Sequence, residues 1–217
     1  MRSPVSDSNQ QIVERRRAVS EAFHSFHQPL TSLHCGLELA LSKPRTEGEY
    51  RKRMEDALVN AGQILRLNKA LRELVDATDP GERFGTVALD PLMAQLREET
   101  SLVGGAAGVA LEYTGPFDVQ VTADPMKLLL TLGNLVSGLV SRTTSGGEVK
   151  VQGNYQYGHI EITITTDAFV GSLPDPSDIE NKLREIRIDA ARTYFETIGG
   201  TCSMQDTGYN VALPVRG

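Results

Sequence analysis

Two runs of apolar residues at helical spacing constrain this fold more than any other feature of the sequence. Apolar side chains that recur at steps of three and four residues form a stripe along one face of a helix. The first stripe consists of Val19, Ala22, Phe23, Phe26, Leu30, Leu33, Leu37, Ala40 and Leu41. The second consists of Met54, Ala57, Leu58, Ala61, Ile64, Leu65, Leu71, Leu74 and Val75. Between them, Lys43–Gly48 carries turn chemistry. The pattern predicts an antiparallel hairpin of two long helices.

A hairpin of two helices cannot cover both of its own apolar stripes. Two copies side by side bury the stripes inside a four-helix bundle. The sequence therefore predicts a homodimer held together through roughly residues 10–77.

After Asp79-Pro80-Gly81 the period changes, and short β-rich segments alternate with helical ones. The predicted strands are Phe84–Leu89, Val109–Tyr113, Val119–Thr122, Glu148–Gly153, His159–Thr166, Cys202–Gln205 and Val211–Pro214. The predicted helices are Asp90–Val103, Asp124–Arg142 and Ile179–Ile198. This order predicts an α/β sandwich, one sheet covered by helices. The expected fold class is α+β, with a hairpin domain at 1–79 and a sandwich domain at 80–217.

Composition narrows the functions that this chain can have. The 217 residues are 40% hydrophobic and 23% charged, as is typical of soluble globular proteins. A net charge of −6 without a basic stripe argues against nucleic-acid binding. Two cysteines, Cys35 and Cys202, are too few for a disulfide scaffold. No apolar run approaches the ~18 residues of a membrane span, and the polar N-terminus is unlike a signal peptide. We expect a cytoplasmic protein that binds neither nucleic acid nor membrane.

Three of the four histidines fall within eleven residues, in the stretch FHSFHQPLTSLHCGLELAL. At roughly 100° per residue, the mean direction of the apolar stripe lies near Phe26 and Leu30. His24 lies roughly 150° from that direction and is predicted to face solvent, whereas His27 and His34 lie only roughly 70–90° from it. A zinc site needs three or four converging ligands, and we expect no carboxylate or thiol to complete one here. No metal ligand is therefore predicted.

The register that begins at His24 resembles the H-box of bacterial sensor histidine kinases. That pattern is histidine, an acidic residue, two variable residues, threonine or asparagine, then proline and leucine, and here it reads HSFHQPLTSL. Over nearly its full length the chain resembles the kinase core, a phosphotransfer hairpin followed by an ATP-binding sandwich. The resemblance implies that His24 accepts a phosphoryl group. Ser25 replaces the carboxylate that takes the ring proton, which weakens autokinase activity.

The boxes that hold ATP in these kinases are altered in this chain. In the helix that resembles the N-box, Gly138 replaces the asparagine that holds Mg²⁺, and glycine offers no oxygen. The Asp-x-Gly-x-Gly box has become DAFVG, so Phe169 stands where the backbone approaches the base. The glycine-rich lid is absent, because Leu173–Asp178 leads directly into the last helix. We expect no cofactor, with any Mg²⁺ supplied by a partner.

These departures favour a histidine phosphotransferase that resembles the sporulation initiation phosphotransferase B and ChpT families. In this interpretation His24 takes a phosphoryl group from one receiver-domain aspartate and passes it to another without ATP. Ser25, His27, Gln28 and Thr31 are expected to support the transfer or the docking. The expected partners are response-regulator receiver domains, a hybrid kinase and a second copy of the chain.

Other interpretations stay open at this point. The protein can be a pseudokinase adaptor that docks a receiver or a kinase without chemistry. It can also act as a phosphatase, with Gln28 aligning a water on a receiver's phosphoaspartate. An ATP-dependent kinase would need compensations that the sequence does not show, and an unrelated two-domain protein is the last alternative.

Overall fold

The computed structural model describes residues 27–169 and 179–216. The chain divides into two compact units, residues 1–73 with 175–186 and residues 74–174 with 187–217. His24, Ser25 and the residues predicted to replace the lid lie outside the described residues. The predicted domain boundary at residues 79 and 80 stays a prediction.

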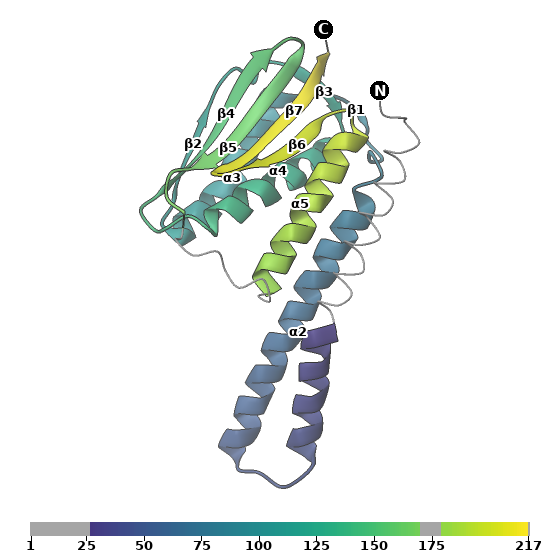
Figure 1. Cartoon of the computed structure of the whole chain (residues 1–217), viewed down its shortest axis with the longest axis vertical. Helices are drawn as coiled ribbons and strands as arrows, with labels where there is room; N and C mark the ends of the chain where they lie inside the picture. The colour runs from purple at the N-terminus through teal and green to yellow at the C-terminus, as the bar shows by residue number, and fades with distance from the viewer. Residues whose placement is uncertain (1–26, 170–178, 217) are drawn as a thin grey trace. The chain divides into compact units, whose positions relative to one another are not determined.

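The described part of the first unit is helical on both sides of a turn (Figure 1). Residues 27–41 form one helix, and α2, Glu47–Asp76, begins after the turn. Thr46 starts α2 with a capping box: its Oγ1 accepts a hydrogen bond from the Glu49 backbone N–H at 3.3 Å, and Glu49 Oε2 accepts one from the Thr46 N–H at 2.9 Å. Arg45 Nη2 donates to the Leu39 carbonyl at 2.7 Å and satisfies the end of the first helix. The predicted turn and second helix are confirmed, and so is the first helix from residue 27 to residue 41. The part of the first apolar stripe before residue 27 lies outside the described residues.

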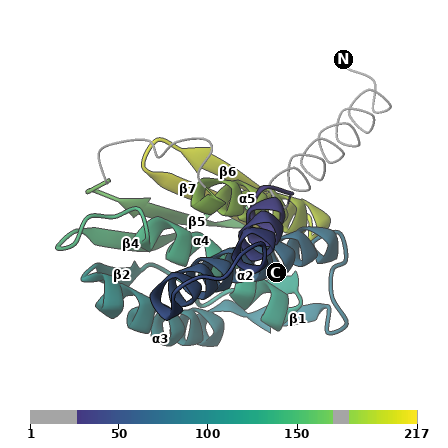
Figure 2. The same ribbon diagram turned by 90° about the horizontal axis from the view of Figure 1, so that it is seen from below.

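The second unit is an α/β sandwich built on a seven-stranded sheet with the order β1-β3-β7-β5-β4-β2, in which β6 also pairs with β7. Its strands are β1 (Gly85–Ala88), β2 (Ala110–Thr114), β3 (Gln120–Ala123), β4 (Glu148–Gln156), β5 (His159–Thr166), β6 (Thr201–Gln205) and β7 (Gly208–Arg216). The helices α3 (Leu89–Ala107) and α4 (Pro125–Val140) cover one face of the sheet (Figures 1 and 2). The last helix, α5, spans Ile179–Thr197. The predicted fold class is confirmed.

Alternation in the sequence positions the core of the sandwich. In β5, Ile160, Ile162 and Ile164 are fully buried, while the residues between them are only partly covered. Leucines of α4 pack at helical spacing, and Leu128 and Leu132 are likewise inaccessible to solvent. Since burying one such side chain stabilises a fold by about 1.5–3 kcal/mol, these contacts hold the helix layer on the sheet.

Strand β4 runs past its predicted end at Gly153 to Gln156. A glycine inside a strand pattern reads as a break, but here it makes room for an aromatic ring. A Cβ at Gly153 would approach Phe117 Cε1 to 2.5 Å. The β4–β5 hairpin then turns at Tyr157 and Gly158, both with positive φ, as tight hairpins require.

Candidate functional site

The first candidate site is the polar face of the helical segment 27–41. His27, Gln28 and Thr31 are exposed on it. Residues four apart are neighbours on a helix surface, so His27 and Thr31 share one face. His24 and Ser25 lie outside the described residues, and their predicted roles stay predictions.

The same helix brings together ligand types that the sequence interpretation did not expect to meet. His34 Nδ1 lies 3.6 Å from Glu38 Oε2, and ligand atoms of His34, Cys35 and Glu38 all lie within 4.8 Å of one another. A carboxylate and a thiol therefore lie beside His34. The expectation that neither completes a metal site here stays a prediction. The thiol comes from the residue after His34, and the carboxylate comes from one turn further along the helix.

Between this helix and α2 the first unit contains a cavity of about 410 Å³. Its walls are Ser32, Leu33 and Gly36 on one side and Arg53, Asp56, Ala57, Val59 and Asn60 of α2 on the other. Small and polar residues predominate, so the two helices do not form a closed apolar core over this stretch.

The second candidate site is the C-terminal end of α4, where the resemblance places a nucleotide. Gly138 is half-buried, and a Cβ added there would meet no atom within 4 Å. The first atom of a side chain would therefore meet open space here, and glycine brings no gain in packing at this position.

The segment after β5 folds onto the end of α4. Thr144 donates its backbone N–H to the Ala168 carbonyl at 2.8 Å, and Thr143 pairs with Phe169 in an isolated antiparallel bridge. The Arg142 guanidinium lies 4.8 Å from the centre of the Phe169 ring, within the range of a cation–π contact. These contacts join the segment after β5 to the C-terminal end of α4.

Asp167, the residue that matches the adenine-reading carboxylate, also has a partner within the protein. Its Oδ1 accepts a hydrogen bond from the Glu148 backbone N–H at 3.2 Å, at the start of β4. Beside it, the hydroxyls of Thr143 and Thr166 lie 3.0 Å apart in a buried contact. Both groups link the loop to the sheet.

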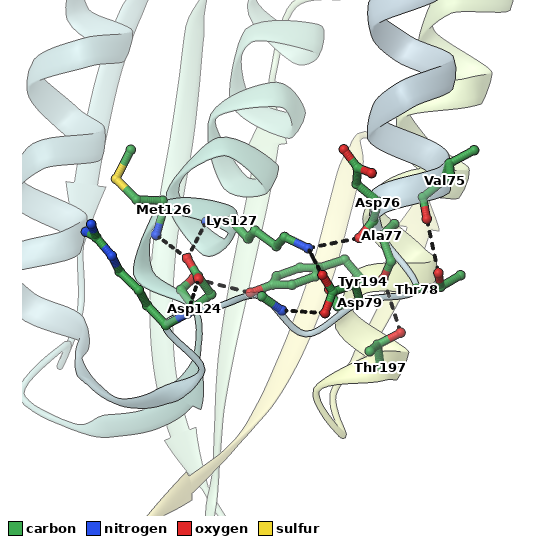
Figure 3. Close-up of polar contacts among 12 residues, drawn as sticks. Val75, Asp76, Ala77, Thr78, Asp79, Asp124, Met126, Lys127, Tyr194 and Thr197 are labelled. Carbon is green, nitrogen blue, oxygen red and sulfur yellow. Dashed lines mark hydrogen bonds and ion pairs between the residues drawn. The ribbon is translucent and has the colours of Figure 1, made fainter.

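A third set of polar contacts was missed by the sequence interpretation and lies where the chain enters the sandwich (Figure 3). Lys127 Nζ donates to the carbonyls of Asp76 and Asp79 at 3.0 and 2.8 Å and lies 3.4 Å from the Asp79 carboxylate. Thr197 Oγ1 donates to the Ala77 carbonyl at 3.2 Å. The residues that leave α2 are thus bound to the start of α4 and the end of α5.

Asp124 is the centre of that junction. Its Oδ1 accepts hydrogen bonds from the backbone N–H groups of Met126 and Lys127 and so caps α4. Its Oδ2 accepts a hydrogen bond from the backbone N–H of Arg83 at 2.9 Å. Burial alone would raise the pKa of Asp124, but these donors and the Lys127 charge together hold it below its usual value. Tyr194 donates to the Asp124 carbonyl at 3.3 Å, and burial raises the pKa of Tyr194 to about 12.

One part of this junction could have been found in the sequence. Asp124-Pro125 is a recognisable helix start, since aspartate caps helices and proline favours the first turn. Its contact with Arg83 joins residues 41 positions apart, and no local pattern reveals such a pair.

Comparison with known proteins supports the architecture. The chain is similar to the histidine kinase ThkA, solved in complex with the response regulator protein TrrA, with a TM-score of 0.64 and 17% identity over 96% of this chain and 65% of that one. It is similar to the Acinetobacter baumannii histidine kinase AdeS, with a TM-score of 0.60 and 12% identity over 89% and 98% of the two chains. It is also similar to full-length ShkA, solved in complex with AMPPNP, with a TM-score of 0.54 and 13% identity over 92% of this chain and 45% of that one.

No protein-family model matches the chain, and no curated protein matches it in sequence. At the identities found, the structural likeness shows the fold alone: a histidine-kinase-like helical region followed by an ATPase-like sandwich. Among the helices of the described residues, none is long and apolar enough to span a membrane.

Proposed function

We propose that this protein is a dimeric histidine phosphotransferase that relays a phosphoryl group between receiver-domain aspartates through His24 without using ATP. The observation that supports ATP independence most directly is the closure between α4 and the segment after β5. Arg142 stacks on Phe169, and Thr144 binds Ala168, where a kinase would admit the nucleotide. Gly138 adds to this, because it offers no oxygen to a metal.

The chemistry of the relay needs one imidazole and two receivers. A ring nitrogen of His24 attacks the phosphorus of a receiver's phosphoaspartate, and the P–O bond to the aspartate breaks as the P–N bond forms. The second receiver's aspartate then attacks the same phosphorus, and the imidazole leaves. Mg²⁺ bound by the receiver stabilises the charge on the transferring group. Gln28 and Thr31 are both exposed, and we propose that they contact the receiver when it docks.

A receiver partner is supported by the likeness to ThkA, which was solved with a response regulator. The same comparison includes full-length ShkA, which was solved in complex with AMPPNP. What separates this chain from such a kinase is the set of side chains around α4, and an experiment must decide whether they exclude ATP.

The dimer is supported by exposed apolar faces on both helices of the first unit. On α2, Met54, Leu58 and Leu65 are exposed and lie on one side at helical spacing. On the segment 27–41, Leu30, Leu37 and Leu41 are likewise exposed and lie on one side of the helix. Two copies would cover these faces as a four-helix bundle.

Label transfer tests the relay. The purified full-length protein is incubated with a panel of phosphorylated receivers, and acid-labile label on it is followed. We expect His24→Ala to abolish the label, while His27→Ala and His34→Ala keep most of it. Label that persists in His24→Ala would mean that another residue accepts the group, and a wild type that no receiver labels would overturn the proposal.

Calorimetry with Mg-ATP tests the proposal that the protein does not use ATP. We expect no binding heat at up to roughly millimolar nucleotide. A micromolar dissociation constant would instead favour an ATP-dependent kinase.

One observation favours an alternative function, receiver dephosphorylation. Gln28 is exposed one turn from His24 in the sequence, and an amide at that distance can orient a water. If this is the activity, the protein accelerates the decay of a receiver's phosphoaspartate, Gln28→Ala abolishes that effect, and no label reaches the protein. A non-catalytic adaptor would bind the receiver without either effect.

A further inference from the structure

Three side chains with different metal-ligand atoms converge on the helical segment 27–41. The imidazole of His34, the thiol of Cys35 and the carboxylate of Glu38 each offer one ligand atom, and these atoms lie within 4.8 Å of one another. The imidazole and the carboxylate already lie 3.6 Å apart. All three residues are exposed, so an ion can reach them from solvent.

Helix geometry explains why the three groups meet. His34 and Glu38 are four residues apart and Cys35 and Glu38 three apart, the two spacings at which side chains are neighbours on a helix surface. Bonds of about 2.0–2.3 Å in a tetrahedral zinc site separate neighbouring ligand atoms by roughly 3.4–3.7 Å. The His34–Glu38 distance of 3.6 Å fits that range. The remaining distances need a closure of about one ångström, which rotamer changes of exposed side chains can supply.

The set of ligands selects the class of ion. Nitrogen, sulfur and oxygen together suit zinc and its first-row neighbours, whereas Mg²⁺ and Ca²⁺ prefer oxygen alone. Three protein ligands leave a fourth position for water or for a group from a partner.

The position on the helix keeps the cluster accessible. At roughly 100° per residue, its mean direction lies roughly 90° from the exposed Leu30, Leu37 and Leu41. It lies roughly 160° from the residues of this helix that line the cavity against α2. Neither α2 nor a second copy in a bundle would therefore cover it.

We propose that His34, Cys35 and Glu38 form a binding site for one divalent transition-metal ion per chain, zinc above all. This site is independent of phosphotransfer, because it uses neither His24 nor the sandwich. The proposal therefore stands or fails separately from the function proposed above.

Cobalt is a suitable probe, since a Co²⁺–thiolate bond gives a charge-transfer absorption that no other ligand here produces. The metal-free, full-length protein is kept reduced with a non-chelating phosphine and titrated with Co²⁺, then with Zn²⁺ as competitor. We expect one Co²⁺ per chain, a thiolate band, and displacement by Zn²⁺, which binds more tightly than Co²⁺. The other thiol, Cys202, should stay silent, because it is buried and burial raises its pKa to about 11.

Variants assign the ligands. Cys35→Ser should remove the band, and His34→Ala or Glu38→Gln should weaken metal binding about tenfold or more, as the loss of groups around a metal does. His159→Ala removes another exposed imidazole, on β5, and should change nothing. Circular dichroism checks that each variant keeps its helix. No binding by the wild type, one ion per two chains, or a band that survives Cys35→Ser would each overturn the site.

Discussion

The hairpin and the sandwich place their apolar residues in opposite ways. In the sandwich, Ile162 and Leu132 are 0% exposed. On the helices of the first unit, Leu65 is 70% exposed and Leu58 75%. A large apolar side chain gains about 1.5–3 kcal/mol when it is buried, so the sandwich obtains this stabilisation within one chain. On α2, Leu67 is buried in the same way, whereas the exposed leucines can obtain this stabilisation only from something that covers them.

Leu65→Asp should dissociate the dimer or unfold the hairpin, because a carboxylate cannot enter an apolar interface without a partner. The expected loss is at least the burial energy of the leucine, about 1.5–3 kcal/mol per chain. Sedimentation velocity measures the mass in solution. Leu102→Asp is the matched control, since Leu102 is a 78% exposed leucine on α3 of the sandwich, and it should leave the mass unchanged. A folded wild-type monomer would show that the exposed leucines of the hairpin need no partner to cover them.

The contrast between the two regions was largely visible in the sequence. The alternation of β5 predicted both of its ends, and the two helical stripes predicted the hairpin and its turn. What local patterns could not reveal were contacts between distant residues. Phe117 fills the space above Gly153, and Lys127 reaches back to Asp76 and Asp79. Such pairs depend on the completed fold.

The candidate site was predicted less completely, for the same reason. One position of the sequence was enough to predict that Gly138 stands where the kinases have an asparagine that holds the metal. That Phe169 would stack under Arg142 depends on how the end of β5 approaches the end of α4. The cluster of His34, Cys35 and Glu38 was within reach of sequence reasoning, because its spacing is purely helical. It was missed because thiol and carboxylate neighbours were not placed on the helix.

Gly81→Ala tests how tightly the entry to the sandwich is built. Gly81 has φ of +107°, and a Cβ there would lie 2.5 Å from the Cβ of Asp124. Strain and overpacking together should lower the free energy of unfolding of the sandwich by about 2–4 kcal/mol. Gly158→Ala is the control, with a positive φ of +79° but open space around the new Cβ, and should lose only about 1–2 kcal/mol. Denaturant unfolding measures both, and equal losses would show that Asp124 is not closely packed there.

Asp124→Asn tests the same junction by pH. A carboxylate whose pKa is lowered in the folded state stabilises the fold above its ordinary pKa of about 4 and loses that contribution as the pH falls through its folded value. The wild type should therefore lose stability on acidification, and the variant should lose less. At neutral pH the asparagine cannot accept all three N–H donors, so we expect a cost of about 1–2 kcal/mol. Thermal melts between about pH 3 and pH 7 measure the difference. Parallel profiles for the two proteins would mean that Asp124 does not titrate differently on folding.

Gly138→Asn should have the smallest effect on stability. It tests whether the C-terminal end of α4 is as tightly packed as the core of the sandwich. The added side chain meets open space, and asparagine is only slightly better than glycine inside a helix. The free energy of unfolding should therefore change by no more than about 0.5 kcal/mol.

Gly138→Asn also tests nucleotide binding. If the Arg142–Phe169 stack and the Thr144–Ala168 hydrogen bond exclude the nucleotide, restoring the amide alone will not produce Mg-ATP binding in calorimetry. Phe169→Gly is the companion change, because it removes the ring that Arg142 covers. Binding that appears in Gly138→Asn alone would mean that only a metal ligand is missing and that the region is open. Binding that appears only when both changes are combined would assign the exclusion to the closed segment.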